Sequence, residues 1–462
     1  MQLFIELGQI FIYSFALAVF MPVFWVVLFL VFMQYRRLAA NEEKLFGRVI
    51  NPIGRQMLAA LGYGIIGGFI ASAILVLLGL SLEQIGLYFI WPVALLLLLI
   101  NPRYLCFSYA GGIVAVTVLI VRHIIAPLFP GLGDTVVVEA LLNIHIPALL
   151  VLIGLLHLVE ALLIYIDGTR GSSPVYLKMD SGEVVGAFSL QRFWPIPLVA
   201  LLVSLVFQTD IMGVTMPEWW PVLQSALEPG PGQSLQYMAV PVAAGLGYAD
   251  MALTSKPEAR TKYTARQLAV YSVILLVVAI GSEFYGWLVL PGVIFAPVGH
   301  ELLILYGKKK ERSEKLLYRS PESGVKLMMV LPGTIAFDAG LQEDDLITEI
   351  NGVAVNSSSE LMDKIEESYF MVLIRGWRRG QQFSAVMRKR AQQPGDEKEL
   401  FRRSLMKHSA YALPHRSAEL GLIPVPDHDS KVYFEIKKSN PFAFIRRFAG
   451  RVKTMVGINR AG

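Results

Sequence analysis

Two pairs of histidine and glutamate in this 462-residue chain have residue types and spacing that could do chemistry. His157 and Glu160 are three residues apart, so a helix would place an imidazole and a carboxylate on one face. His300 and Glu301 start a pattern like HExxH, in which two histidines one turn apart bind zinc and the glutamate is a general base. Ile304 stands where the second histidine is required, so a zinc site on this helix would lack a ligand.

These pairs also have a structural interpretation. An ionisable group in a membrane span is a functional candidate, but a hydrogen bond that holds a helical bundle together requires no catalysis. We interpret His157, Glu160 and the nearby Asp167 as structural partners, and we expect no catalytic residue, no metal and no cofactor. Four other polar residues of the apolar region are interpreted as isolated bundle or interface groups: Arg122, His145, Asp250 and Glu283.

The distribution of charge divides the chain into two parts. Residues 1–306 contain 31 charged side chains with a net charge of −3, whereas residues 307–462 contain 46 with a net charge of +8. With 55% hydrophobic residues, the composition excludes a wholly soluble enzyme, and the single cysteine, Cys106, excludes a disulfide scaffold. The basic part suits an anionic membrane surface better than nucleic acid, so we expect a lipid bilayer and no nucleic acid as partner.

The first part predicts an α-helical polytopic membrane domain over residues 1–306, with eight or nine spans. The apolar runs lie near 10–33, 57–80, 87–100, 104–120, 141–166, 193–207, 237–253, 268–282 and 286–306. Alternate loops, including the short loop 101–103, hold 13 of the 14 basic residues of this part. The positive-inside rule therefore places these loops and the soluble part in the cytoplasm, and nine spans would leave the N-terminus outside.

The second part begins with a basic juxtamembrane linker over 307–319 and continues as a small mixed α/β module over 320–390. Strands are expected over 325–330 and 346–350, a capping box of Ser357 and Glu360 opens a helix over 359–368, and Asn351-Gly352 is a hairpin signal. The run from Pro332-Gly333-Thr334 through Asp345-Leu346-Ile347 to Ile350-Asn351-Gly352 resembles a PDZ domain. The sequence thus predicts a helical membrane domain followed by a PDZ-like domain.

The PDZ resemblance implies that a partner peptide adds as a strand between the 325–330 strand and the 359–368 helix. The residues expected to line this groove are Ser323, Gly324, Val325, Leu327, Leu361 and Ile365. Glu322 would repel a terminal carboxylate, so an internal peptide or a folded partner is an equal alternative. Ordinary core positions are the other interpretation of the apolar residues in this set.

The tail over 391–462 is expected to contain a strand at 431–436 and a basic amphipathic helix after Asn440-Pro441. Such a helix can lie on an anionic membrane, although packing against the module is an equal alternative. The basic residues expected at the membrane surface are Lys308, Lys309, Lys310, Arg446, Arg447 and Arg451.

Several short runs follow one another between residues 157 and 221. They are His157-Leu158-Val159-Glu160-Ala161, Ser172-Ser173-Pro174, the stretch 186–194, Ile196-Pro197-Leu198 and Glu218-Trp219-Trp220-Pro221. Their order, with the module after the last span, resembles the MinJ family of cell-division topological determinants. The resemblance implies a non-enzymatic scaffold of the cell membrane, enriched at septa and poles, that links DivIVA-like and MinD-like division proteins. The alternatives are a PDZ-containing intramembrane protease and an export-accessory membrane protein.

Overall fold

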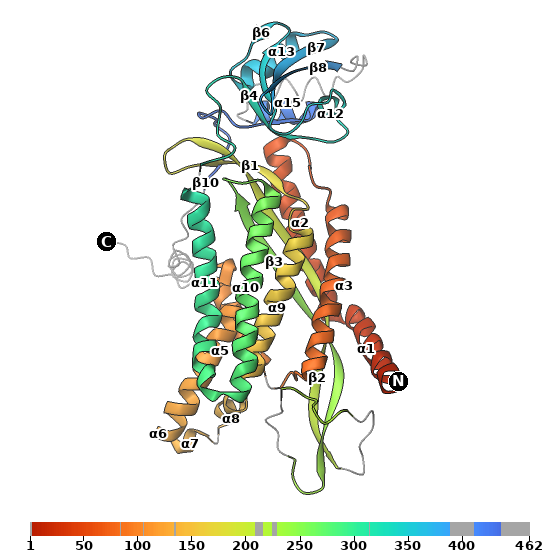
Figure 1. The fold of residues 1–462 in the computed structure, drawn as a ribbon, viewed down its shortest axis with the longest axis vertical. Helices are drawn as coiled ribbons and strands as arrows, with labels where there is room; N and C mark the ends of the chain where they lie inside the picture. Colours follow the sequence, from red (N-terminus) through yellow and green to blue (C-terminus); the bar gives the residue numbers. More distant parts are fainter. Residues whose placement is uncertain are drawn as a thin grey trace, which may run out of the picture.

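The protein is a column of helices with a small mixed α/β module at one end (Figure 1). The structure is a computed structural model that describes residues 2–83, 85–104, 106–133, 135–207, 216–223, 229–313, 315–388 and 411–435. Within these residues six helices are long and apolar enough to cross a membrane. The expected helical membrane region, followed by a mixed α/β region, is therefore confirmed.

The helices of the column form what we call the bundle, together with two long strands. The six long helices include α2 (Pro22–Phe46), α3 (Ile53–Leu78), α9 (Ile146–Asp167), α10 (Pro257–Phe284) and α11 (Val289–Ser313). The sixth is α5 (Phe107–Ile120), which continues through a π-helical turn (Val121–Ile125) into α6 (Ala126–Leu128). Shorter helices are α1 (Gln2–Phe20), α4 (Leu87–Ile100), α7 (Pro130–Gly133) and α8 (Val136–Leu142).

Two segments expected to be membrane helices are strands instead, so that part of the prediction is wrong. The runs 193–207 and 237–253 lie in β2 (Val184–Phe207) and β3 (Gln233–Ala252). These strands pair antiparallel without a break from Phe188 opposite Ala252 to Phe207 opposite Gln233. Prolines at 195, 197 and 241 each disfavour a helix interior, which agrees with these runs forming strands, although α4 and α11 each accommodate one internal proline.

The helices satisfy the edge of β2 that faces away from β3. Tyr35 Oη of α2 exchanges two hydrogen bonds with the backbone of Phe193, both at 3.1 Å. The Ser72 hydroxyl of α3 accepts a hydrogen bond from Val199 N at 2.8 Å. An unpaired backbone group in an apolar environment costs several kcal/mol, roughly, so these contacts are what allows a strand here.

Proline and glycine complete the same contact between β2 and α3. Pro195 and Pro197 have no N–H to satisfy, and their carbonyl oxygens lie against Gly64 and Gly68. A Cβ atom at these two glycines would lie 2.2 and 2.1 Å from the oxygens. Only glycine therefore lets the helix approach the strand this closely.

A buried ion pair joins the end of α9 to β2. Arg192 and Asp167 both have fully buried side chains, and Arg192 Nε donates to the carboxylate at 2.8 Å. Trp194 Nε1 and Arg170 Nε donate to the same carboxylate, each at 2.9 Å, and Arg192 also bonds Gln56. Loss of Asp167 would leave Arg192 buried without a counter-charge, and loss of Arg192 would leave the buried Asp167 with the partly exposed Arg170 alone.

Substitution of one member of this pair should therefore destabilise the bundle strongly. Asp167→Ala or Arg192→Ala should each lower the free energy of unfolding by about 3–5 kcal/mol. The double variant should lose less than the sum, since neither charge is then left unpaired. Thermal unfolding of the detergent-solubilised protein checks this, with Glu322→Ala on the exposed surface as the control. Additive losses would show that the two charges do not act as a pair.

The module contains a six-stranded sheet in the order β8-β7-β5-β4-β9, with β6 paired to β5. Its strands are β4 (Val325–Val330), β5 (Leu346–Ile350), β6 (Val353–Ala354), β7 (Met371–Arg378), β8 (Gln381–Arg388) and β9 (Leu422–Pro424). Its helices are α12 (Ile335–Asp338), α13 (Ser358–Glu367) and α15 (Ala412–Leu420). The hairpin residues Asn351 and Gly352 have φ of +50° and +84°, and Ser357 Oγ accepts from Glu360 N at 3.1 Å.

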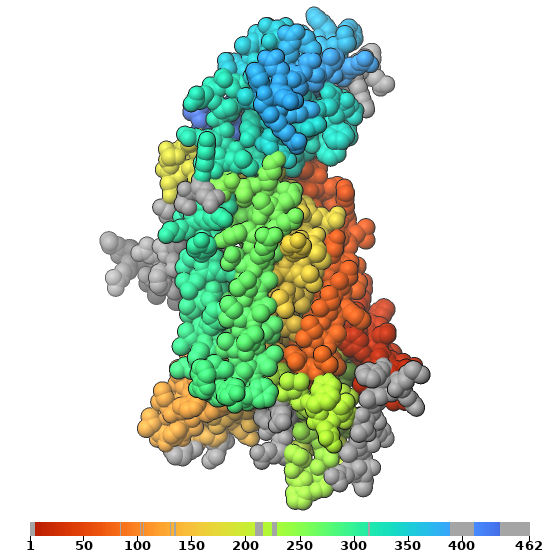
Figure 2. Space-filling view, viewed as in Figure 1, coloured from red at the N-terminus to blue at the C-terminus, as the bar shows by residue number. Residues whose placement is uncertain are grey.

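A short β structure lies between the bundle and the module (Figure 1). Strand β1 (Ser173–Lys178) pairs with the first part of β2, and β10 (Phe434–Glu435) pairs parallel to β1. The space-filling view shows the module seated directly on the upper ends of the helices (Figure 2). Strand β2 therefore runs from the base of the module deep into the bundle.

Candidate functional site

The sequence predicts a peptide-binding groove between β4 and α13. Val325, Leu327, Leu361 and Ile365 are all buried in the core of the module. Ser323 is exposed, whereas Gly324 is buried, has a φ of +79° and donates its N–H to Asn356 Oδ1 at 3.1 Å. The four apolar residues of the predicted set are thus core residues of the module, which is the other interpretation that the sequence allows.

The chain's own C-terminal part occupies that strand edge. Strand β9 pairs antiparallel with β4, with Leu327 opposite Pro424 and Val330 opposite Leu422. Leu331 N donates to Gly421 O at 2.9 Å, and the Leu422 side chain is fully buried in the module's core. We call residues 411–427 the returning segment, because it comes back from beyond β8 to fill the edge of β4.

Polar contacts hold both ends of the returning segment against α13. Arg416 Nε lies 2.5 Å from Glu366, and its Nη2 lies 3.4 Å from Asp363. At the other end, the Asp427 carboxylate accepts hydrogen bonds from the N–H and the hydroxyl of Ser358, at 3.1 and 3.2 Å. Burial raises the pKa of Asp427, although the bonds from Ser358 oppose this shift. The segment is therefore held against α13 at Arg416 and at Asp427.

The returning segment also contacts the bundle. Ile423 packs in a buried cluster with Leu45 and Phe46 at the end of α2. Tyr176 Oη of β1 donates to Pro424 O at 3.0 Å, and His415 Nε2 lies 3.1 Å from the carbonyl oxygen of Lys44. The same 17 residues thus close the groove and attach the module to the bundle.

A charged contact joins the module to the loop before α10. Lys256 Nζ lies 2.6 Å from Asp344 Oδ2 and 3.3 Å from Glu343 Oε1, and Lys326 Nζ lies 3.2 Å from Asp344 Oδ1. Burial alone would raise the pKa of Asp344, but the hydrogen bonds and charges of Lys256 and Lys326 hold it below its usual value. The contact is partly exposed, so its contribution to stability is at most about 1 kcal/mol.

Carbodiimide crosslinking should detect this contact in the full chain. The reagent should join Lys256 to Asp344 or Glu343, and Lys256→Gln should abolish that product. The exposed pair of Lys364 and Glu367, 2.8 Å apart, provides a crosslink within the module as an internal control. Mass spectrometry of the digested protein reads both products. A 364–367 crosslink without one from Lys256 would show that the module does not rest on this loop.

The contact should also respond to pH in a defined direction. The pKa of Asp344 is lowered in the folded protein. The contact of Asp344 therefore makes its full contribution to stability above the ordinary carboxyl pKa of about 3.9. It is lost only as the pH falls through the lowered value. Lys256→Gln should raise the Asp344 pKa, so NMR titration of the carboxyl carbon should show a higher midpoint in the variant. An unchanged midpoint would contradict the pairing.

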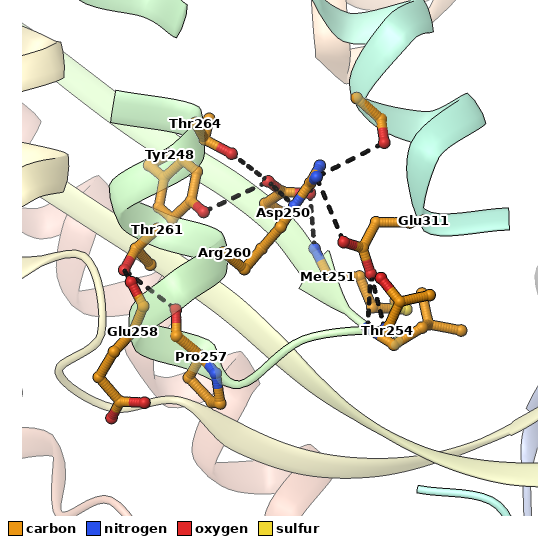
Figure 3. Close-up of polar contacts among 12 residues, drawn as sticks. Tyr248, Asp250, Met251, Thr254, Pro257, Glu258, Arg260, Thr261, Thr264 and Glu311 are labelled. Carbon is orange, nitrogen blue, oxygen red and sulfur yellow. Dashed lines mark hydrogen bonds and ion pairs between the residues drawn. The ribbon is translucent and has the colours of Figure 1, made fainter. Parts of the chain in front are cut away.

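A second charged network closes the junction of β3, α10 and α11 (Figure 3). Arg260 binds Asp250 through Nε at 2.8 Å and Nη2 at 3.0 Å, and its Nη1 lies 3.4 Å from Glu311. Glu311 Oε2 accepts hydrogen bonds from Leu253 N at 2.8 Å and Thr254 N at 3.0 Å. Asp250 is therefore not the isolated group that the sequence suggested.

The other three groups interpreted as isolated have partners too. His145 Nε2 lies 3.3 Å from Glu283 Oε2, and Arg122 Nη2 donates to the carbonyl oxygens of Leu142 and Ile144 at 2.9 and 3.0 Å. These interpretations were wrong because the partners are more than 19 residues away in the sequence. Sequence spacing within one helix could not indicate them.

The basic residues expected at the membrane surface fall into two sets. Lys308, Lys309 and Lys310 lie in the last turns of α11, which continues as a helix to Ser313 into the expected linker 307–319. Lys310 Nζ lies 4.1 Å from the centre of the Tyr263 ring. Arg446, Arg447, Arg451 and the amphipathic helix lie outside the described residues.

The centre of the bundle holds a third polar cluster. Cys106, His157 and His300 each offer a ligand atom, and these atoms all lie within 4.8 Å of one another. Cys106 Sγ lies 3.1 Å from His157 Nε2, and the rings of His157 and His300 are 5.0 Å apart. The sequence pattern pointed to both histidines but not to the cysteine, because the three residues come from three separate parts of the chain.

Glu301 is engaged beside this cluster. It forms an ion pair with Arg103 and accepts a hydrogen bond from Tyr109 Oη at 2.5 Å. His157 is the twelfth residue of α9, so its contact with Cys106 places the turn before α5 against the middle of that helix. The loop 101–103, expected at the cytoplasmic end, therefore lies halfway along the bundle.

Comparison with known proteins agrees with the resemblance seen in the sequence. The chain is 24% identical over 224 residues to "Cell division topological determinant MinJ" of Bacillus subtilis (strain 168), covering 48% of this chain and about half, 53%, of that protein. It is 25% identical over 353 residues to "Probable cell division topological determinant MinJ" of Lacticaseibacillus paracasei, covering 75% of this chain and 85% of that protein. The resemblance to the MinJ family is confirmed.

A shorter similarity concerns a different class of protein. A stretch of 73 residues, 15% of this chain, is 42% identical to serine protease HTRA1 of Xenopus laevis and covers 16% of that protein. No protein-family profile matches the chain. The MinJ relatives therefore account for most of the chain, and the protease resembles only a small part.

Proposed function

We propose that this protein is a membrane scaffold for division-site selection that catalyses no reaction. The observation that most supports this is the similarity over 75% of the chain to a protein named as a cell-division topological determinant. The module is fixed to the end of the bundle by the returning segment and by Lys256. This attachment would hold the module close to the bilayer until a partner binds.

The module faces the cytoplasm in this proposal. The loops that hold most of the basic residues of the first part, 34–56, 167–192 and 254–267, lie at the module's end of the bundle (Figure 1). The positive-inside rule assigns such loops to the cytoplasm. By resemblance to the family, the partners are a DivIVA-like curvature-sensing protein and a MinD-like ATPase, and the protein gathers at septa and poles.

Imaging in the native host tests this proposal. A fluorescent fusion should concentrate at septa and poles, and deletion of the gene should misplace septa. A variant lacking residues 320–435 but keeping the bundle is the matched control, since it should stay in the membrane and fail to restore septum placement. A uniform membrane signal together with normal septum placement in the deletion strain would overturn the proposal.

The proposal includes PDZ-like strand addition at β4, which requires the returning segment to leave. In the exchange, a partner strand would replace β9, because β9 already pairs antiparallel with this edge. The backbone hydrogen bonds lost by β9 and gained by the partner strand would be alike. The partner side chains that take the places of Leu422 and Ile423 would therefore determine which partner sequence binds. This requirement explains how a filled groove can still serve as a binding site.

A disulfide lock tests whether exchange takes place. Met329 and Ile423 are direct partners across β4 and β9, so Met329→Cys with Ile423→Cys should crosslink on oxidation. The oxidised full chain in nanodiscs should capture the DivIVA-like or MinD-like partner at least about tenfold less well than the reduced chain, a difference of about 1.4 kcal/mol. Equal capture by the oxidised and the reduced chain would show that the partner does not bind at the edge of β4.

A second cysteine pair controls for oxidation itself. Leu373 and Val386 are direct partners across β7 and β8, away from the groove. Leu373→Cys with Val386→Cys should form a disulfide in the same sheet and leave partner capture unchanged. A loss of capture in this control as well would attribute the effect to oxidation and count against exchange.

A further inference from the structure

We propose that Cys106, His157 and His300 form a binding site for a zinc ion at the centre of the bundle. The three side chains come from the turn before α5, from α9 and from α11, so one ion would join three separate segments. A thiolate and two imidazoles form a ligand set that suits Zn²⁺, with a fourth position left for water or a carboxylate. This site is independent of the scaffold role proposed for the module.

The distances are close to those that zinc requires. Tetrahedral zinc with bonds of about 2.0–2.3 Å places its ligand atoms roughly 3.3–3.8 Å apart. Cys106 Sγ and His157 Nε2 are 3.1 Å apart, and no separation among the three ligand atoms exceeds 4.8 Å. A shift of about 1 Å would bring even a separation of 4.8 Å into the range that zinc requires.

The hydrogen bonds of His157 prepare it as a ligand. Its Nδ1 lies 2.7 Å from Ile153 O, a backbone acceptor, so Nδ1 carries the proton. Nε2 is then an acceptor and takes the S–H of Cys106 at 3.1 Å, so zinc would replace that proton between the two atoms. A backbone carbonyl that fixes the tautomer of a metal-binding histidine is a common feature of zinc sites.

His300 provides the second, independent observation. Its Nδ1 is buried and makes no hydrogen bond with any residue that the structure describes. An unpaired buried ring nitrogen is costly, and binding to a metal would offset that cost. The ring packs edge-on against those of Tyr109 and Tyr271, which hold His300 beside the cluster.

The surroundings also suit a dication. On zinc binding the Cys106 thiol would lose its proton, so its thiolate would supply one negative charge beside the ion. Glu301 is held by Arg103 and Tyr109, so it stays outside this set.

Metal analysis of the purified full chain tests the proposal. Protein prepared in detergent with zinc in the growth medium should retain about one zinc ion per chain. Cys106→Ser, His157→Gln and His300→Gln should each reduce this content at least about tenfold. His123→Gln is the matched control, since His123 lies exposed in the π-helical turn of the same bundle and should keep full content.

Cobalt substitution gives a readout that does not depend on folding of the variants. Chelated wild-type protein loaded with Co²⁺ should show the visible bands of tetrahedral cobalt and a thiolate charge-transfer band in the near ultraviolet. Zinc added to chelated protein should also raise its melting temperature. A chain without stoichiometric zinc, cobalt spectra without the thiolate band, or equal zinc loss in His123→Gln would each overturn the proposal.

Discussion

The fold depends on satisfying the backbone of a long hairpin that lies among apolar helices. Beyond Ser189, where its pairing with β1 ends, strand β2 has β3 on one side only, and its other edge finds partners on α2, α3 and the loop that follows α3. Oxygen atoms of the Tyr35, Ser72 and Glu83 side chains accept hydrogen bonds from backbone N–H groups of β2. Pro195 and Pro197 have no N–H group, so two fewer acceptors are needed. An unpaired backbone group is costly away from water. The hairpin therefore depends on each of these side chains as much as on the residues of its own strands.

The hairpin in turn sets where the module lies. Strand β2 continues past β3 to pair with β1, and Tyr176 of β1 bonds the backbone of the returning segment. Leu422 faces the core of the module, while its neighbour Ile423 faces the end of α2, as expected for alternate residues of a strand. One short strand therefore belongs to both parts, and the module cannot move far from the bundle while β9 stays paired.

Local patterns in the sequence predicted the hairpin and the helix cap of the module. The features that the sequence did not predict depend on contacts between distant residues. The hairpin at Asn351-Gly352 and the cap at Ser357 depend on neighbours within four residues, and both occur in the structure. Segments 193–207 and 237–253 were predicted as helices because apolar length outweighed their prolines, and only pairing with each other reveals them as strands. The filling of the groove by residues 411–427, and the meeting of Cys106 with two histidines, likewise join positions more than 50 residues apart.

A groove filled from within changes the energetics of any partner that uses it. A partner strand competes with a tethered segment that is always present, so its apparent affinity is reduced by the fraction of time the groove is open. If the segment leaves about 1% of the time, binding is roughly 100-fold weaker than to an empty groove. Exchange also breaks the contacts of Ile423 and His415 with α2, so it would loosen the module from the bundle at the same moment. Binding of the partner and release of the module from the bundle are then coupled. A change that weakens the contact of the returning segment with α2 would therefore also favour binding of the partner.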